Sequence, residues 1–392
     1  MIKFSLRPNL IYPVQYLIYH QLRNAETKLI TYFYKFKGSS FYTFLMFLGE
    51  FIFGLIFYLR QKRFVIKNKI VENKSKKHMY LELIQTERRL GTIDSITKII
   101  FIIFAAASFD FVEFIIIFKA PNFINVSISF QDRLRGFMTI INALFYYFIL
   151  LLPIYKHQFV SLVIIGICLL IIFITECFFQ EFNIFLDFGR FFYVFVISLI
   201  GNFFRALLDS TEKYNFEYNK VNPLYALMFE GFFGCIFTCL YWISEKPFDG
   251  LVKVYKDFSA AEFIIFILCL IIYIILSGLK NVYRVVTTKI FSPMTSTSQD
   301  YILNPIEMII NLTAYDDFRV KKEINYLYFS INFILAMIIT LCGCVYNEFI
   351  ILFFCGLERN THKAISLRSI TGEENLINLM KINDLDDEDD VA

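Results

Sequence analysis

The sequence predicts an all-α, polytopic membrane protein of about ten transmembrane helices, arranged as two inverted repeats of five helices. Three observations lead to this prediction. Of the 392 residues, 57% are hydrophobic and only 19% are charged, long apolar runs recur along the chain, and two segments of the first half have echoes in the second. Soluble globular proteins average about 25% charged residues, so this composition is not theirs.

Nine apolar runs come close to or exceed the roughly 20 residues that a bilayer-spanning helix needs. They lie at about 41–59, 97–118, 125–153, 158–178, 189–210, 222–244, 260–279, 288–313 and 324–355. Residues 8–34 are a poor tenth candidate, because Pro13, His20 and Arg23 interrupt them. The chain thus divides into an N-terminal segment with a degenerate first helix (1–40), a first repeat (41–180), a second repeat (181–356) and a tail (357–392).

The orientation follows from the connection after the first clear helix, residues 60–96. This loop carries ten basic residues: Arg60, Lys62, Arg63, Lys67, Lys69, Lys74, Lys76, Lys77, Arg88 and Arg89. The positive-inside rule keeps such loops in the cytosol. Eight further crossings return the tail to the same side, so we expect a cytosolic C-terminus. The tail ends in an acidic run, which we interpret as a solvated, disordered segment in preference to a partner-docking motif.

The internal echoes predict the inverted arrangement. The segment MFLGEFIFG (46–54) recurs in altered form as MFEGFFG (228–234), and Gln131-Asp132 followed by Ile140-Ile-Asn142 reappears as Gln299-Asp300 followed by Ile309-Ile-Asn311. The order of the echoes is the same in both halves. With an odd number of five crossings in each half, the second half must enter the membrane from the opposite side, as in transporters with a site between inverted repeats.

Ionisable residues interrupt the apolar runs. They include Glu50, Asp110, Glu113, Asp132, Arg133, Arg135, Glu176, Arg205, Asp209, Glu230, Asp300 and Glu307. At a helix centre each costs about 2.5 to 3.5 kcal/mol, so together they cannot face lipid. We expect them to pair with one another or to line a wet cavity. Asp110 and Glu113 are three residues apart and therefore share a helix face.

Four residues, two of the ionisable ones and two glutamines next to such residues in the sequence, are candidates for binding a solute. Gln131 and Arg135 lie four residues apart and place an amide and a guanidinium on one helix face, which suits an anionic or hydroxyl-bearing solute. Gln299 and Asp300 are their counterparts in the second half. The alternative is structural, with Asp132 and Asp300 paired to arginines that hold helices together.

The remaining acids are candidates for gating or coupling. Glu50 and Glu230 lie beside Gly49 and Gly231, where helix packing or gating competes with solute contact as an interpretation. Asp110 and Glu113 follow a small-residue stretch, Ala105 to Ser108, that allows close helix approach.

Other function classes find little support in the sequence. There is no Gly-rich phosphate loop, no Gly-x-Ser-x-Gly and no His-Glu-x-x-His, so we do not expect an enzyme. The four His are scattered, and all eight Cys fall in apolar stretches where a thiol acts as a small hydrophobe. We therefore expect no metal and no cofactor. A net charge of +3 with basic residues confined to loops does not indicate nucleic-acid binding.

Four motifs in a fixed order resemble the drug/metabolite transporter superfamily, over about residues 41–355. They are FLMFLGEF (44–51), SISFQDRLRG (127–136), Asn222-Pro-Leu with Glu230-Gly-Phe-Phe-Gly234, and Tyr346-Asn347-Glu348. The likeness is greatest to the nucleotide-sugar-transporter-like proteins of solute carrier family 35, its F branch in particular, which are EamA-like carriers.

The resemblance implies two inverted five-helix repeats, a central cavity lined by the first four helices of each half, and an endomembrane location. By motif, Glu50 corresponds to the acid of the second family helix, Gln131 and Arg135 to the fourth helix, Glu230 to the seventh and Asp300 to the ninth. The chain departs from the family at Asp300-Tyr-Ile-Leu303, where relatives tend to have an arginine. It also lacks the lysine-bearing signature of the better-defined nucleotide-sugar carriers.

We therefore expect a secondary transporter that moves a small polar or anionic solute, of the nucleotide-sugar or a related metabolite class, across a Golgi, ER or endolysosomal membrane by alternating access. The expected partners are that small molecule and the lipid bilayer, with no nucleic acid and with a homodimer left open. The alternative is a non-transporting scaffold or regulatory subunit. Tight ion pairs and apolar side chains in the centre would favour the scaffold, whereas an open, charged, water-filled cavity would favour transport.

Overall fold

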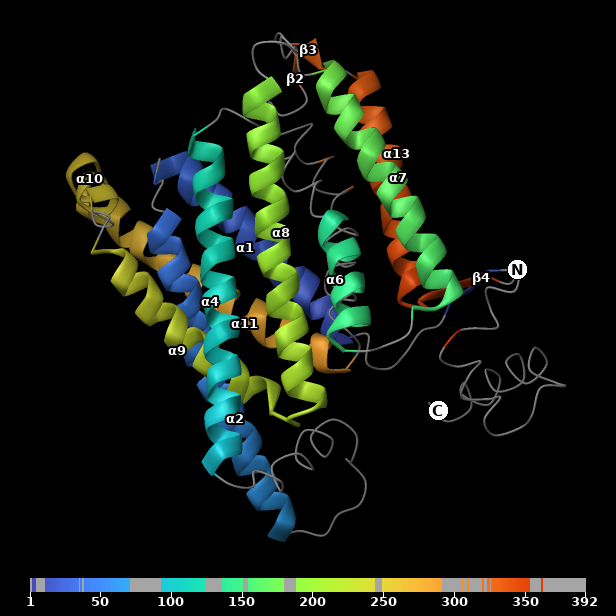
Figure 1. Cartoon of the computed structure of the whole chain (residues 1–392). Helices are drawn as coiled ribbons and strands as arrows, with labels where there is room; N and C mark the ends of the chain where they lie inside the picture. Colours follow the sequence, from blue (N-terminus) through green and yellow to red (C-terminus); the bar gives the residue numbers. More distant parts are fainter. Residues whose placement is uncertain are drawn as a thin grey trace, which may run out of the picture.

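The computed structural model describes most of the helical part of the chain (Figure 1). The described residues are 2–4, 11–34, 36, 39–70, 93–123, 136–150, 154–179, 188–243, 249–290, 305, 309, 319–320, 323–324, 326–352 and 361. Within them are ten helices and four short strands.

The helices are α1 (Ile11–Tyr34), α2 (Ser39–Ile70), α4 (Ile93–Phe123), α6 (Gly136–Phe148), α7 (Lys156–Phe179), α8 (Phe188–Glu217), α9 (Pro223–Tyr241), α10 (Asp249–Asp257), α11 (Ala260–Ile290) and α13 (Tyr326–Tyr346). The strands form two small antiparallel pairs, β1 (Ile2–Phe4) with β4 (Ile350–Leu352) and β2 (Arg319–Val320) with β3 (Glu323–Ile324). The fold is thus helical throughout its core.

Among the helices that the structure describes, six are long and apolar enough to cross a membrane: α2, α4, α7, α9, α11 and α13. Large apolar side chains lie exposed on their outer surfaces, for example Phe101 on α4, Leu170 on α7 and Ile264 on α11. Such faces suit contact with lipid and would be unusual in a soluble protein. The architecture is therefore that of a multi-pass integral membrane protein.

Helices α2 and α9 pack closely in opposite directions, because glycines remove the side chains between them. A Cβ atom on Gly231 would lie 2.7 Å from the carbonyl oxygen of Phe47, and one on Gly54 would lie 2.9 Å from the backbone nitrogen of Met228. Such a stripe of small residues lets helix backbones approach each other in membrane proteins. At one end of the pair, Gln61 meets Asn222; at the other, Phe44 packs against Trp242.

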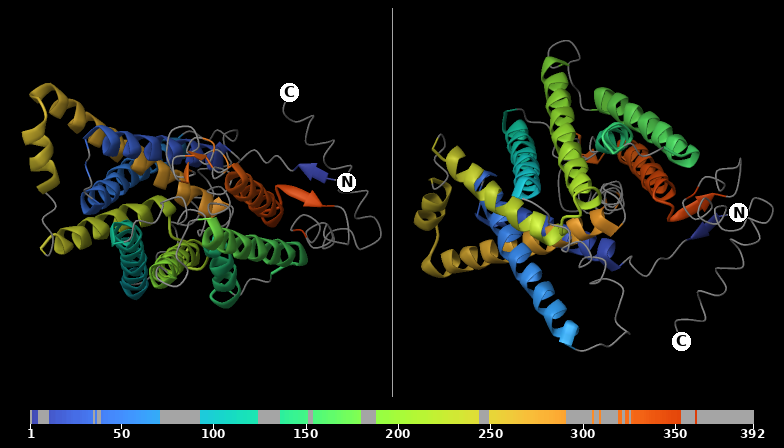
Figure 2. Two further views of the ribbon diagram at one scale, coloured as in Figure 1. Left: turned by 90° about the horizontal axis from the view of Figure 1, so that it is seen from above. Right: turned by 60° about the horizontal axis from the view of Figure 1, so that its bottom comes forward.

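Other helix pairs complete the bundle, and not all of them are antiparallel: α2 and α11 run in the same direction, since Tyr42 packs on Tyr273 and Glu50 accepts a hydrogen bond from Asn281. Helix α1 packs against α11, α4 against both α8 and α9, α2 against α11, and α7 against α13. Two further views show α7 and α13 side by side at the edge of the bundle (Figure 2). Helices α1 and α11 run in opposite directions, since Tyr34 donates a hydrogen bond to Glu262 O while Tyr19 stacks on Tyr283.

Local sequence signals begin the second-half helices. Asn222 caps α9 by accepting a hydrogen bond from the backbone of Leu224, and Pro223 occupies the first helical position. Ahead of α11, Ser259 and Glu262 form a reciprocal capping box. These residues fix where two buried helices enter the bundle.

The structure differs from the sequence-based boundaries at several places. Residues 11–34, within the segment 8–34 predicted as a degenerate first helix, form one continuous helix, α1, with His20 and Glu26 buried against the bundle; α1 is not among the described helices apolar enough to cross a membrane. The loop predicted to begin at 60 begins later, because α2 continues to Ile70, and the run predicted to end at 279 continues as helix to Ile290. The last run ends at Tyr346, and strand β4 follows it. Apart from Thr361, the predicted cytosolic tail lies outside the described residues, as do residues 71–92 of the predicted loop.

Candidate functional site

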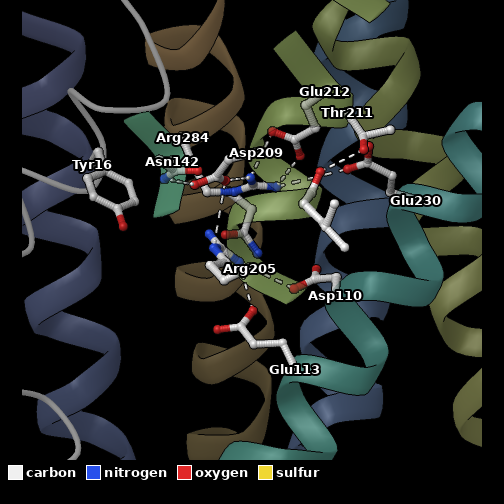
Figure 3. Close-up of polar contacts among 12 residues, drawn as sticks. Tyr16, Asp110, Glu113, Asn142, Arg205, Asp209, Thr211, Glu212, Glu230 and Arg284 are labelled. Atoms are coloured by element: carbon white, nitrogen blue, oxygen red, sulfur yellow. Dashed lines mark hydrogen bonds and ion pairs between the residues drawn. The ribbon is translucent and has the colours of Figure 1, made fainter. Parts of the chain in front are cut away.

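A buried cluster of charged residues lies where α2, α4, α8, α9 and α11 meet (Figure 3). It consists of Glu50, Asp110, Glu113, Arg205, Asp209, Glu212, Glu230 and Arg284, and we call it the charge cluster. Helices of both halves contribute to it. Its composition matches the expectation that ionisable groups in apolar helices gather together.

Arg284 on α11 is the most buried cation, with 1% of its surface exposed. Its guanidinium binds Glu212 through two parallel hydrogen bonds, with N···O distances of 2.9 Å and 2.6 Å. Asp209 lies 3.5 Å and Glu230 3.9 Å from the same guanidinium. This bidentate geometry is the strong form of an Arg–carboxylate pair.

Arg205 on α8 organises the neighbouring part of the charge cluster. Its Nη1 atom donates to Asp110 and Glu113 of α4, each at 3.3 Å, and its Nε atom lies 3.7 Å from Asp209. Asp209 therefore bridges the two arginines. Asn142 of α6 also donates to Asp209, at 3.4 Å, which adds a third helix, after α8 and α11, to the contacts of this carboxylate.

Glu50 approaches the charge cluster from α2 without touching either arginine within ion-pair distance. One carboxylate oxygen accepts a hydrogen bond of 2.5 Å from Asn281 of α11, and the other is buried without a hydrogen-bond partner. Only 1% of Glu50 is exposed. It is thus the least compensated member of the charge cluster.

The charge cluster contains more acid than base. Six carboxyl groups face two guanidinium groups, so full ionisation would leave four uncompensated negative charges in a buried site. Uncompensated buried charge is so costly that such groups neutralise instead. The charge cluster therefore carries an acidic surplus that its two arginines do not offset.

The sequence-based site residues divide into two groups. Asp110 and Glu113 share a helix face as predicted and bind the same arginine. Glu50 and Glu230 lie in the charge cluster, and their gating or coupling roles stay predictions. Gln131, Arg135, Gln299 and Asp300 lie outside the described residues, as do Asp132, Arg133 and Glu307, so their predicted roles also stay predictions.

Sequence reasoning did not include Glu212, Arg284 and Asn281 in the site. Glu212 lies just beyond the run predicted to end at 210, and Arg284 and Asn281 lie between the runs predicted at 260–279 and 288–313. In a hydropathy pattern, charged residues at the end of an apolar run are assigned to the following loop. A signal was available in the four-residue spacing of Tyr273, Ser277 and Asn281, which marks one polar face of a continuous helix.

In the described part of the chain, no three His, Cys, Asp or Glu side chains are placed to hold a metal ion. No family model matches the chain, and no curated protein matches its sequence.

Proposed function

We propose that the protein is a secondary carrier with two inverted repeats, in which the charge cluster is the polar centre between the halves. The observation that carries this proposal is the location of six carboxyls and two arginines, drawn from both halves, within a bundle of apolar helices. Intramembrane ionisable residues are costly and usually mark solute, ion or proton pathways.

The pattern of helix packing supports the inverted repeat. Exchanging α1 with α8, α2 with α9, α4 with α11 and α7 with α13 maps the α2–α9 and α7–α13 pairs onto themselves, α1–α11 onto α4–α8, and α2–α11 onto α4–α9. The exchanged helices α2 and α9 run in opposite directions, as a two-fold axis in the membrane plane requires. So do α7 and α13, because His157 at the start of one lies 3.6 Å from Glu348 after the end of the other.

The equivalent connections of the two halves also support inversion. The α1–α2 connection lies at the end of the bundle where Phe41 stacks on Trp242. The α8–α9 turn lies at the other end, where Asn222 meets Gln61. The connection between the first and second helices of each half therefore lies at opposite ends of the bundle in the two halves.

We propose a small polar solute of the nucleotide-sugar or a related metabolite class, moved with protons across an endomembrane. The acidic surplus supports proton coupling, since an anionic group could bind here only when carboxyls carry protons. Arg135 and Gln131 remain the proposed solute clamp, and Glu50 and Glu230 the proposed coupling acids.

Purified protein in proteoliposomes tests the proposal. A thermal-shift screen against nucleotides, nucleotide sugars and amino acids selects solutes, and counterflow uptake of each hit is then measured. We expect uptake by the wild type, loss of uptake in Arg135→Ala and Asp110→Asn, and retention in the surface variant Lys220→Ala. Unchanged uptake in Arg135→Ala removes that residue from the site, and absence of uptake for every solute overturns the carrier proposal.

One observation favours the alternative, a scaffold that keeps the fold without transport. Both arginines are already held by carboxylates, and the Arg284–Glu212 pair is tight. Static ion pairs of this kind can hold helices together without any solute. A scaffold would be stabilised by none of the solutes and would show no uptake.

A further inference from the structure

A second buried carboxyl lies outside the charge cluster, on α1. Glu26 is 8% exposed, and neither of its carboxylate oxygens has a hydrogen-bond partner of normal geometry, although the backbone of Tyr273 lies close enough to interact with it. This residue belongs to the segment that the sequence marks as a poor membrane helix. The polar composition of this segment does not predict that Glu26 is buried against α11.

The groups around Glu26 do not compensate a negative charge. Arg23, one turn earlier on α1, forms no ion pair with it and donates instead to the side chain of Asn24 at 3.2 Å. The titratable groups that face it from the packed helices are Tyr42 of α2 and Cys269 and Tyr273 of α11. All three are neutral at physiological pH. A buried carboxylate without a cation or donors is expected to take up a proton.

Glu26 is separate from the charge cluster along α11. It lies beside the backbone of Tyr273, whereas Asn281, which donates the 2.5 Å hydrogen bond to Glu50, lies eight residues further along the same helix. Residues spaced by four share a helix face and rise about 6 Å per step, so two turns of α11 separate the positions beside the two acids.

We propose that Glu26 is a proton-binding site separate from the charge cluster. Its carboxyl takes up a proton as the pH falls and releases it as the pH rises, independently of the carboxyls around Arg205 and Arg284. Only the use of this proton to drive a solute rests on the proposed function.

Infrared difference spectroscopy of the full-length protein in lipid nanodiscs tests the site without any transport measurement. The carbonyl band of a protonated carboxylic acid is followed through steps of pH. In steps from neutral to alkaline pH, where exposed carboxyls are already ionised, we expect Glu26→Gln to remove one pH-dependent component of this band, Glu26→Asp to retain a shifted component, and the exposed control Glu262→Gln to leave the band unchanged. Glu26→Gln keeps the size of the side chain, and size-exclusion chromatography verifies its folding.

A band unaltered by Glu26→Gln overturns the proton site. A protein that loses the component in Glu26→Gln yet transports no solute supports the proton site while rejecting the carrier proposal, so the two failures are distinct.

Discussion

Arg284 is the residue on which the charge cluster most depends. It binds Glu212 by two hydrogen bonds and also approaches Asp209 and Glu230, so three carboxyls share its positive charge. Planar guanidinium groups are suited to such sites because they present several donors in a rigid fork and stay charged. Lysine could offer one point charge but not the paired contacts with Glu212.

Truncation of Arg284 should therefore destabilise the protein strongly. Breaking a buried ion pair by removing one partner costs about 3 to 5 kcal/mol, since the other charge stays buried and unpaired. We expect Arg284→Ala to lower the thermal unfolding midpoint in detergent markedly and Arg284→Lys to lower it less. The matched control is Lys220→Ala, whose exposed pair with Glu217 spans 3.9 Å and should contribute less than about 1 kcal/mol. Equal midpoints for Arg284→Ala and the control would contradict this role.

The α2–α9 interface depends on the absence of side chains at its glycines. Gly231 faces the backbone of α2, and an added Cβ atom would collide with Phe47 O and with the side chain of Glu50, 2.9 Å away. Backbone atoms cannot move aside as a flexible side chain does. The two helices would have to separate, and Glu50 would shift relative to the charge cluster.

We expect Gly231→Ala to reduce stability although alanine is the better helix former by about 1 kcal/mol. Gly166→Ala is the matched control, because a Cβ atom there meets only the end of Ile140 at 3.7 Å, an ordinary contact. Thermal unfolding and size-exclusion profiles of both variants measure the difference. If Gly231→Ala were as stable as Gly166→Ala, the close approach of α2 and α9 would be wrong.

The ends of α8 and α11 cap each other through two lysines. Lys213 of α8 donates to the carbonyl oxygens of Thr288 and Lys289, and Lys289 donates to the carbonyl oxygen of Phe216 at 2.7 Å. Cations near a helix C-terminus satisfy free carbonyls and interact favourably with the helix dipole. This reciprocal capping joins the two helices that carry Arg205 and Arg284.

Replacing Lys213 by Met should loosen this junction. Hydrogen bonds to charged groups contribute about 1.5 to 3 kcal/mol each, and Met keeps the apolar part of the side chain. We expect faster amide hydrogen exchange in the last turns of α8 and α11 than in wild type, measured by mass spectrometry. Lys253→Met on the exposed face of α10 should leave exchange there unaltered. Wild-type exchange in Lys213→Met would show that the capping contributes little.

The sequence predicts the helical membrane class and most helix positions, because apolar composition over 20 residues depends on local residues alone. It predicts for the same reason that Asp110 and Glu113 share a helix face, since their spacing of three residues is a local property. It does not predict the helical continuity from 280 to 290 or the burial of Glu26. A hydropathy pattern assigns polar residues to solvent-facing positions. Arg284 is nevertheless buried, because Glu212 on another helix compensates its charge. Such pairing depends on tertiary contacts that no local pattern encodes.

The residues at the two ends of the bundle differ in chemical character. At one end Gln61, beside Arg60 and Lys62 in sequence, meets Asn222 next to the α8–α9 turn. The hydroxyl of Tyr218 in that turn donates to Leu150 O, just after α6. By the positive-inside rule we expect this end to face the cytosol. Trp242 and the beginning of α2 lie at the opposite end.

Sidedness in sealed microsomes tests this assignment together with the membrane crossing of the α2–α9 pair. Lys220→Cys places a thiol on the α8–α9 turn, and Ile243→Cys places one after α9, where the native side chain is 85% exposed. With a membrane-impermeant maleimide, and the parent protein to subtract native thiols, we expect Lys220→Cys to react in intact vesicles and Ile243→Cys only after permeabilisation. Reaction of both in intact vesicles would show that α9 does not cross the membrane. The reverse order would place the basic loop in the lumen and leave α9 spanning, because the two thiols would still be separated by the bilayer.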